Sequence, residues 1–207
     1  MIDPTAEGPS WMSPPPGWLY GTWSLTHTSQ RAYLPLRNIQ FDASPVFPQS
    51  TNTPGRLNDL LTFQIGDSLA LHAVYGIDTP LRSIHRSFDS KWDYSFHLVG
   101  VGGSTGFNLT WAITAWGYDS SGIGYFLLYE HNPPNFDIFS KSDSGPSHET
   151  LESIHKAVRE LGNEKLSQAV GHIVPTMQDG ARRGEPPFQC DMACIDDKEG
   201  CRALGVC

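Results

Sequence analysis

The chain has 207 residues, enough for one domain with a large core or for one domain with appendages. Its composition, 39% apolar and 11% aromatic, is typical of globular proteins, and no apolar run reaches the roughly 18 residues of a membrane-spanning helix. A formal charge of -8 with only 14 Lys and Arg leaves no basic surface for nucleic acid or for an anionic membrane, and neither is an expected partner.

The sequence divides into three predicted segments. Residues 1–17 are rich in proline and should form an extended arm. Residues 18–175 are predicted to form a barrel with a helix, and residues 176–207 a linker and a cysteine-rich tail. Residues 1–17 lack the apolar core of a signal peptide, and we expect that such a signal has been removed.

Short runs that alternate apolar and polar residues fill most of the barrel segment. Gly, Asn, Asp and Pro separate these runs, as is typical of turns between strands. Eight or nine antiparallel strands of this length can close into a barrel. We predict strands at about 18–28, 36–42, 58–66, 69–77, 84–88, 92–100, 106–116, 123–131 and 135–141.

The clearest alternation runs from Phe107 to Ala115, with Phe107, Leu109, Trp111, Ile113 and Ala115 on its apolar face. Asn108 lies on the opposite face and begins the glycosylation sequon Asn108-Leu109-Thr110. A glycan on Asn108 must point to solvent, so the apolar face should point into the barrel. The same period groups Tyr94, Phe96 and Leu98 and, separately, Leu61, Phe63 and Ile65.

After the last strand the apolar period becomes helical. Ser147 is a plausible N-cap and Gly162 a stop signal for one amphipathic helix. A shorter helix is expected at about 164–170. The apolar face of the first helix consists of Leu151, Ile154, Val158 and Leu161.

All four cysteines lie in the tail, at Cys190, Cys194, Cys201 and Cys207. Their even number in a short tail predicts two disulfides and, together with the sequon, a secreted protein. Three pairings are possible and the sequence does not choose among them. Gaps of three, six and five residues do not fit a tetrahedral zinc site, and neither a metal nor another cofactor is expected.

Three features together resemble the lipocalin, or calycin, superfamily: Gly21-Thr22-Trp23 in the first strand, Phe139-Ser140-Lys141 at the end of the last, and the helix that follows. The resemblance implies a mainly β fold, a barrel of eight or nine antiparallel strands with a C-terminal amphipathic helix, here followed by a disulfide-bonded tail. It also implies that Trp23 closes the barrel floor beneath a basic residue. Lys141 stands where the family has arginine and can provide a weaker cation-π contact.

Within the superfamily, residues 18–175 are similar in architecture to the lipocalin domain of plant violaxanthin de-epoxidase. In that family an acidic, cysteine-containing stretch follows the first strand. Here the corresponding stretch, 29–35, has no carboxylate, so the de-epoxidase reaction is not expected. Size and build also resemble the small lipocalin-like fungal hetero-Diels-Alderases of tropolone sesquiterpenoid pathways. That resemblance implies capture of an o-quinone methide by a terpene alkene inside the barrel, without covalent catalysis.

Tyr94 and His27 are the predicted catalytic residues. A phenol in an apolar cavity can polarise a ligand carbonyl, and strict alternation puts His27 on the inward face with Trp23. The competing explanations are ordinary core packing for Tyr94 and a hydrogen-bonded core histidine for His27. The predicted ligand-binding residues are Trp111, Phe96, Leu98, Phe107, Leu109, Ile113, Phe63, Tyr125, Tyr129 and Leu25.

Motifs for covalent, metal-dependent or phosphoryl-transfer catalysis are missing. Ser104 lies in a glycine-rich turn, 102–106, and no close carboxylate pair appears along the sequence. The first hypothesis is therefore an enzyme that gathers apolar polyketide or terpenoid molecules in its barrel and promotes a cyclisation or hetero-Diels-Alder reaction by orientation and hydrogen bonding. A carrier of one hydrophobic ligand is the alternative, and a protein whose cavity is filled by its own side chains is a third. A homodimer is left open.

Overall fold

The computed structural model describes residues 14–15, 17–46, 55–81, 93–100 and 107–207. The strand predicted at 84–88, the turn around Ser104 and most of the predicted arm lie outside these residues. The other predicted strands are present, with ends shifted by a few residues, because single-sequence patterns define element boundaries less well than elements.

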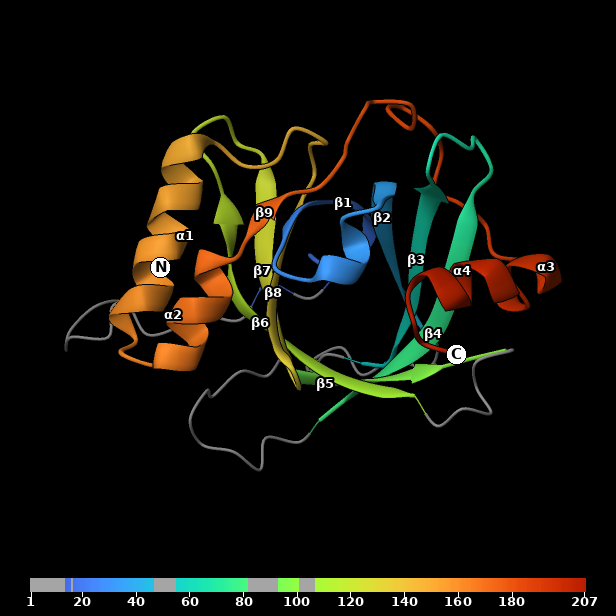
Figure 1. Ribbon diagram of the computed structural model, residues 1–207, viewed down its shortest axis with the longest axis horizontal. Coiled ribbons are helices and arrows are strands. Elements are labelled where there is room, and N and C mark those ends of the chain that lie inside the picture. The colour runs from blue at the N-terminus through green and yellow to red at the C-terminus, as the bar shows by residue number, and fades with distance from the viewer. Residues whose placement is uncertain (1–13, 16, 47–54, 82–92, 101–106) are drawn as a thin grey trace.

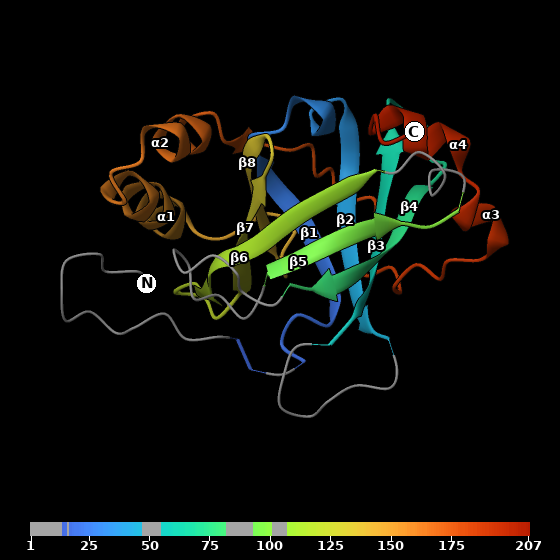
Figure 2. The ribbon, with the colours of Figure 1, turned by 90° about the horizontal axis from the view of Figure 1, so that it is seen from below.

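Eight antiparallel strands close into a barrel in which β1 pairs with both β2 and β8 (Figure 1 and Figure 2). Each strand pairs with the next one along the chain, so the ring follows sequence order. The strands are β1 (Gly21–Thr28), β2 (Leu36–Pro45), β3 (Leu57–Ile65), β4 (His72–Pro80), β5 (Asp93–Leu98), β6 (Asn108–Tyr118), β7 (Gly124–His131) and β8 (Pro134–Ser140).

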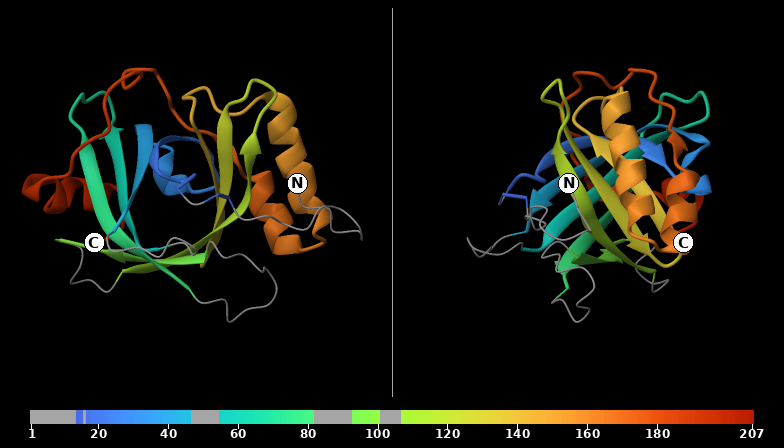
Figure 3. Two further views of the ribbon diagram at one scale, coloured as in Figure 1. Left: turned by 180° about the vertical axis from the view of Figure 1, so that it is seen from behind. Right: turned by 90° about the vertical axis from the view of Figure 1, so that its left-hand side faces the viewer.

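Two helices lie along the outside of the barrel, beside β6, β7 and β8 (Figure 3). The first, α1 (His148–Glu160), is capped by Ser147, whose hydroxyl accepts a hydrogen bond from the Thr150 N–H at 3.3 Å. Gly162, with φ of 68°, ends the helix in the left-handed conformation that glycine favours. The second helix is α2 (Glu164–Gly171). The apolar faces of both helices cover the outward side chains of the barrel wall, as the predicted amphipathic pattern requires.

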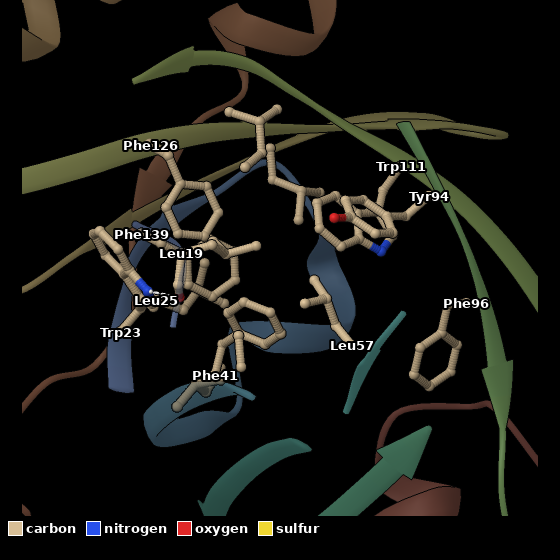
Figure 4. Packing of buried hydrophobic residues seen from close by; sticks show 14 of the residues in the cluster. Leu19, Trp23, Leu25, Phe41, Leu57, Tyr94, Phe96, Trp111, Phe126 and Phe139 are labelled. Atoms are coloured by element: carbon tan, nitrogen blue, oxygen red, sulfur yellow. Dashed lines mark hydrogen bonds between the residues drawn. The ribbon is translucent and has the colours of Figure 1, made fainter. Parts of the chain in front are cut away.

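An aromatic cluster around Trp23 closes one end of the barrel (Figure 4). The indole N–H of Trp23 donates to the carbonyl of Leu19 at 2.7 Å, and the Phe126 ring packs edge-on at 4.9 Å between centroids. The Lys141 ammonium lies 3.8 Å from the centroid of the Trp23 ring and donates to the Thr22 carbonyl at 2.9 Å. Trp23 and Lys141 thus make the floor contact that the sequence predicts.

The chain after α2 returns across the barrel. A short strand, β9 (Val174–Pro175), was not predicted from the sequence. It pairs with His27 and Thr28 of β1, beyond the residues of β1 that pair with β2. Asn38, in a bulge of β2 with φ of 51°, then holds the returning segment. The side-chain amide of Asn38 donates to Asp179 at 2.6 Å, and the backbone carbonyl of Asn38 accepts from the buried Arg182 guanidinium at 3.2 Å. The predicted linker is therefore fastened to the barrel wall.

The tail ends in two short helices, α3 (Met192–Ile195) and α4 (Lys198–Ala203), packed against β4 (Figure 1). Asp197 caps α4 by accepting from the Gly200 N–H at 2.8 Å, and it also accepts from the Ala73 N–H of β4 at 2.9 Å. Both predicted disulfides are present, and of the three pairings the structure has Cys190–Cys194 and Cys201–Cys207. Along the described parts of the chain, no helix has the length and apolar character needed to cross a membrane.

The contact between Lys141 and Trp23 can be tested by substitution. Lys141→Met should lower the free energy of unfolding by about 1 kcal/mol, because it removes the cation-π contact and the hydrogen bond to Thr22. Lys141→Arg should retain most of that stability, since a guanidinium also packs on an indole ring. Urea unfolding followed by circular dichroism measures the difference, with the exposed Lys156→Met as control. Equal losses at positions 141 and 156 would contradict the role of this contact.

Candidate functional site

A cavity of about 240 Å³ occupies the end of the barrel opposite the Trp23 floor. This volume is many times the roughly 10–15 Å³ that one water requires, and it suits a small organic molecule. Most of the wall is apolar and partly aromatic. The apolar lining consists of Phe41, Leu61, Val74, Phe96, Phe107, Leu109, Trp111, Leu128, Phe139, Leu204 and Val206.

Two segments outside the ring complete the cavity wall. After β1 the chain forms a 3₁₀ turn, η1 (Arg31–Tyr33), and Gln30 and Tyr33 reach the cavity from there. The tail contributes Leu204 and Val206, which lie just after α4, next to the Cys201–Cys207 disulfide. The mouth of the barrel is therefore narrowed by chain segments from both ends of the sequence.

One buried carboxyl pair lies between β7 and β8. Glu130 and Asp137 are diagonal neighbours on the inner face, since Leu128 is paired with Asp137 and Glu130 with Asn135. The Gln30 amide donates to Glu130 at 2.5 Å and to Asp137 at 3.2 Å. Burial raises the pKa of Glu130 to about 7. Burial, and then the charge of Glu130, raise the pKa of Asp137 well above its ordinary value.

A second carboxyl pair lies across the ring, on β3 and β4. Asp59 lines the cavity, and Asp78 lies behind it, fully buried. The two side chains hydrogen-bond to each other, and the Trp111 indole donates to Asp78 at 2.9 Å. Burial raises the pKa of Asp78 to about 7, and burial together with the charge of Asp78 raises the pKa of Asp59 well above its ordinary value. The two carboxyl groups therefore titrate as a pair that shares a proton.

Tyr33 lies between the two carboxyl pairs. Its phenol is near enough to Glu130, Asp137 and Asp59 for their charges, after burial, to raise its pKa well above the ordinary value. Two acid pairs and a phenol, from the five elements β3, β4, β7, β8 and η1, therefore lie in or directly behind the wall of one largely apolar cavity.

Near neutral pH this arrangement supplies hydrogen-bond donors. A carboxyl group kept protonated by burial can donate to a ligand oxygen, and the bond is strong where water is excluded. The partner carboxylate of each pair can accept a proton or stabilise positive charge. Among the described residues, no cluster of three or more His, Cys, Asp or Glu has a geometry that could hold a metal ion.

The structure brings part of the predicted ligand-binding set into the cavity. Trp111, Phe96, Phe107 and Leu109 line it, and Asn108 lies at its rim with an exposed side chain, as the sequon requires. The Tyr94 ring stacks on Trp111 with centroids 4.8 Å apart (Figure 4). Tyr94 is fully buried behind that indole rather than at the cavity surface. Other predicted residues pack in or beside the barrel core without lining the cavity: Phe63, Ile113, Leu25 and Leu98.

The inward orientation predicted for His27 is wrong. A bulge in β1 at Thr26 breaks the alternation, so that Leu25 faces the interior and His27 faces outward beside Ile138. His27 lies near His155 of α1, and burial, followed by the charge of His155, lowers the pKa of His27. It therefore has no access to the cavity.

Tyr125 and Tyr129 also lie on the outer face of the barrel. Both pack beneath α1, whereas Phe126 and Leu128 occupy the inward positions of β7. A bulge of β6 after Ile113 turns Ala115 outward as well, away from the apolar face to which alternation assigned it. The orientation predicted for Ala115 fails because a bulge reverses every side chain beyond it. Tyr125 and Tyr129 instead share the outward face of β7 with Leu127.

The carboxyl pairs were missed in the sequence because the two members of each pair lie on different strands, and the pairing register that brings them together is not visible in either strand alone. A weak signal was present: Asp59 shares the period of Leu61, Glu130 that of Leu128, and Asp137 that of Phe139. An acid at an inward position of a strand indicates a buried carboxyl. Gln30 and Tyr33 lie in a connection without periodicity, where sequence offers no such signal.

Comparison with known proteins extends this description. No family model matches the sequence. The chain is 26% identical over 189 residues to "Botcinic acid biosynthesis cluster B protein 12" of Botryotinia fuckeliana (strain B05.10), covering 86% of this chain and 80% of that protein.

Two lobster structures share the architecture. Apocrustacyanin A1 is 16% identical with a TM-score of 0.50 and covers 77% of each chain. H1 crustacyanin from Homarus americanus is 15% identical with a TM-score of 0.51 and covers 84% of this chain and 82% of that one. With its closed ring of eight antiparallel strands and the helix that follows, the chain has the lipocalin fold. This confirms the resemblance to lipocalins that was inferred from Gly21-Thr22-Trp23 and the features around it.

Because of the buried acids, we expect the free energy of unfolding to fall as pH rises from 5 to 8. Burial raises the pKa of Glu130 from its ordinary 4.5 to about 7, and it raises that of Asp137 in the same direction. Between those values the folded state holds more protons than the unfolded state, so the free energy of unfolding decreases with pH. Urea midpoints at the two pH values measure the slope. Glu130→Gln should flatten it and the exposed Asp67→Asn should not; greater stability at pH 8 would contradict this assignment.

The tail forms part of the cavity wall, so we expect faster ligand release when the Cys201–Cys207 disulfide is removed. Replacing both cysteines by serine should loosen Leu204 and Val206 and speed dissociation of the neutral probe N-phenyl-1-naphthylamine about fivefold, equivalent to about 1 kcal/mol. Stopped-flow fluorescence measures the rate. The matched control removes Cys190–Cys194, which closes a similar loop away from the cavity. Equal rates in both double variants would contradict a role for the tail in closing the site.

Proposed function

We propose that this protein, which has the lipocalin fold, binds apolar polyketide- or terpenoid-type molecules in its barrel and promotes their cyclisation or hetero-Diels-Alder addition without a cofactor. The observation that carries the proposal is the presence of carboxyl groups, whose pKa values burial raises, in a largely apolar and aromatic cavity. Similarity to a fungal biosynthesis-cluster protein supports a role in secondary metabolism.

The chemistry of such an addition suits these groups. A carboxyl O–H that donates to the carbonyl oxygen of a heterodiene draws electron density from it and makes it more reactive toward an alkene. Two new σ bonds then form as the π electrons of diene and alkene reorganise, so no atom is lost and the carboxyl keeps its proton. Glu130 and Asp137 are the proposed donors, because Gln30 orients both toward the cavity.

The apolar wall supplies the second contribution. Holding two reactants in contact converts a bimolecular step to an effectively unimolecular one, which can lower the barrier by about 7–11 kcal/mol in the best-oriented cases. Trp111 offers a flat surface for an unsaturated ligand, and its ring is fixed by Tyr94 on one face and by Asp78 at the indole N–H. In this proposal Tyr94 acts by positioning Trp111.

Product analysis tests the proposal against the alternative of a carrier. Purified protein is incubated with humulene and a hydroxymethyl tropolone or phenol precursor, and products are followed by chiral chromatography and mass spectrometry beside a protein-free control. Faster formation of a single enantiomer supports an enzyme. Binding of either molecule without conversion supports a carrier, which returns its ligand unchanged, and no binding of any apolar molecule contradicts both.

Variants assign the donors. The double variant Glu130→Met and Asp137→Leu removes every side-chain donor at the two positions and should reduce the rate about 100-fold, as expected for the loss of a buried hydrogen-bond donor to the reacting oxygen. The exposed Asp67→Leu is the matched control and should react like the wild type. A full rate in the double variant would leave orientation by the aromatic wall as the only source of acceleration. Secretion and glycosylation at Asn108 remain predictions, with which the two disulfides agree.

A further inference from the structure

A second cavity lies outside the barrel, between α1 and the strands that it covers. Its volume is about 140 Å³. The inner wall comes from β6, β7 and β8, and the outer wall from α1 and the start of α2 (Figure 3). The lining consists of Thr114, Ala115, Tyr125, Leu127, Tyr129, Phe136, Ser153, Ile154, Ala157, Val158, Leu161 and Leu166.

The cavity exists because small side chains face one another. The bulge of β6 brings Thr114 and Ala115 to the outer face, and Ser153 and Ala157 approach them from α1. A helix packed on a sheet normally fills this space with larger residues, since protein interiors are close-packed and leave few voids larger than a water molecule. The tyrosines of β7 border the space without filling it.

The lining defines the chemistry of an occupant. None of the lining residues carries a charge, so an ion would lose its hydration without compensation. The hydroxyls of Thr114 and Ser153 already donate to the carbonyls of Leu127 and Glu149, at 3.2 and 2.9 Å. What remains is apolar surface with two phenols, and apolar cavities near 150 Å³ stay dry and take up molecules of the size of benzene.

We propose that this space between α1 and β6–β8 is a second binding site, for a neutral single-ring molecule between benzene and phenol in size. It is separate from the barrel cavity, because the wall of the barrel stands between them. Along β7, Leu127 and Tyr129 face the outer site, whereas Leu128 and Glu130 face the inner one. Ser153, the exposed member of the lining, marks the side on which the site meets solvent.

Fluorobenzene is the probe, followed by fluorine NMR on the intact protein. Ala157→Phe fills the outer site from the helix, and Val74→Phe fills the barrel cavity as the matched control. Fluorobenzene binding should persist in Val74→Phe and weaken more than tenfold when Ala157→Phe is added to that variant. If Ala157→Phe does not fold, as judged by circular dichroism, Ala115→Leu fills the same space from the sheet.

The outcomes separate this site from the barrel. Binding that is lost in Val74→Phe, or that survives both Ala157→Phe and Ala115→Leu, would overturn the proposal. A crystal pressurised with xenon provides an independent readout, with a xenon peak expected between Ala157 and Tyr125. Because the outer site is measured with the barrel blocked, its failure and a failure of the proposed cycloaddition are distinguishable.

Discussion

Closure of eight strands into a ring is the constraint on which the rest of the structure depends. Once the ring is closed, every inward side chain is withdrawn from water, whatever its chemistry. Aromatic residues at inward positions near Trp23 then form a packed floor, and acids at inward positions near the mouth form desolvated pairs. The floor and the cavity therefore both arise from the alternation of inward and outward side chains along the strands. They differ only in which end of the strands contributes the inward residues.

The carboxyl pairs are tolerated because each has its own compensation. Gln30 donates to both Glu130 and Asp137, whereas Asp59 and Asp78 hydrogen-bond to each other. A shared proton removes the charge that burial would otherwise make costly. The segments that complete the mouth, η1 and the end of the tail, exclude water further, so the same contacts that close the cavity also favour raised pKa values for its acids.

Sequence reasoning predicted the barrel because alternation and turn residues repeat along the strands, and it predicted the floor because Trp23 and Lys141 lie in a recognisable context. It failed at His27 and Ala115 for one physical reason: a bulge adds a residue, and every later side chain of that strand changes face. Partners on neighbouring strands were equally hidden, because the register that places Glu130 diagonal to Asp137 is set by the pairing of β7 with β8 and cannot be seen in either strand alone.

The bulges also explain why the molecule has space on both sides of one wall. In β6 the bulge keeps Ile113 inward and turns Ala115 toward α1, so a single strand contributes to the core and to the outer cavity. In β7, without a bulge, neighbouring residues face opposite cavities. A ligand beneath α1 would thus rest against the strand that carries Glu130. The helix covers the outward residues of that strand, directly opposite the acid pair inside the barrel.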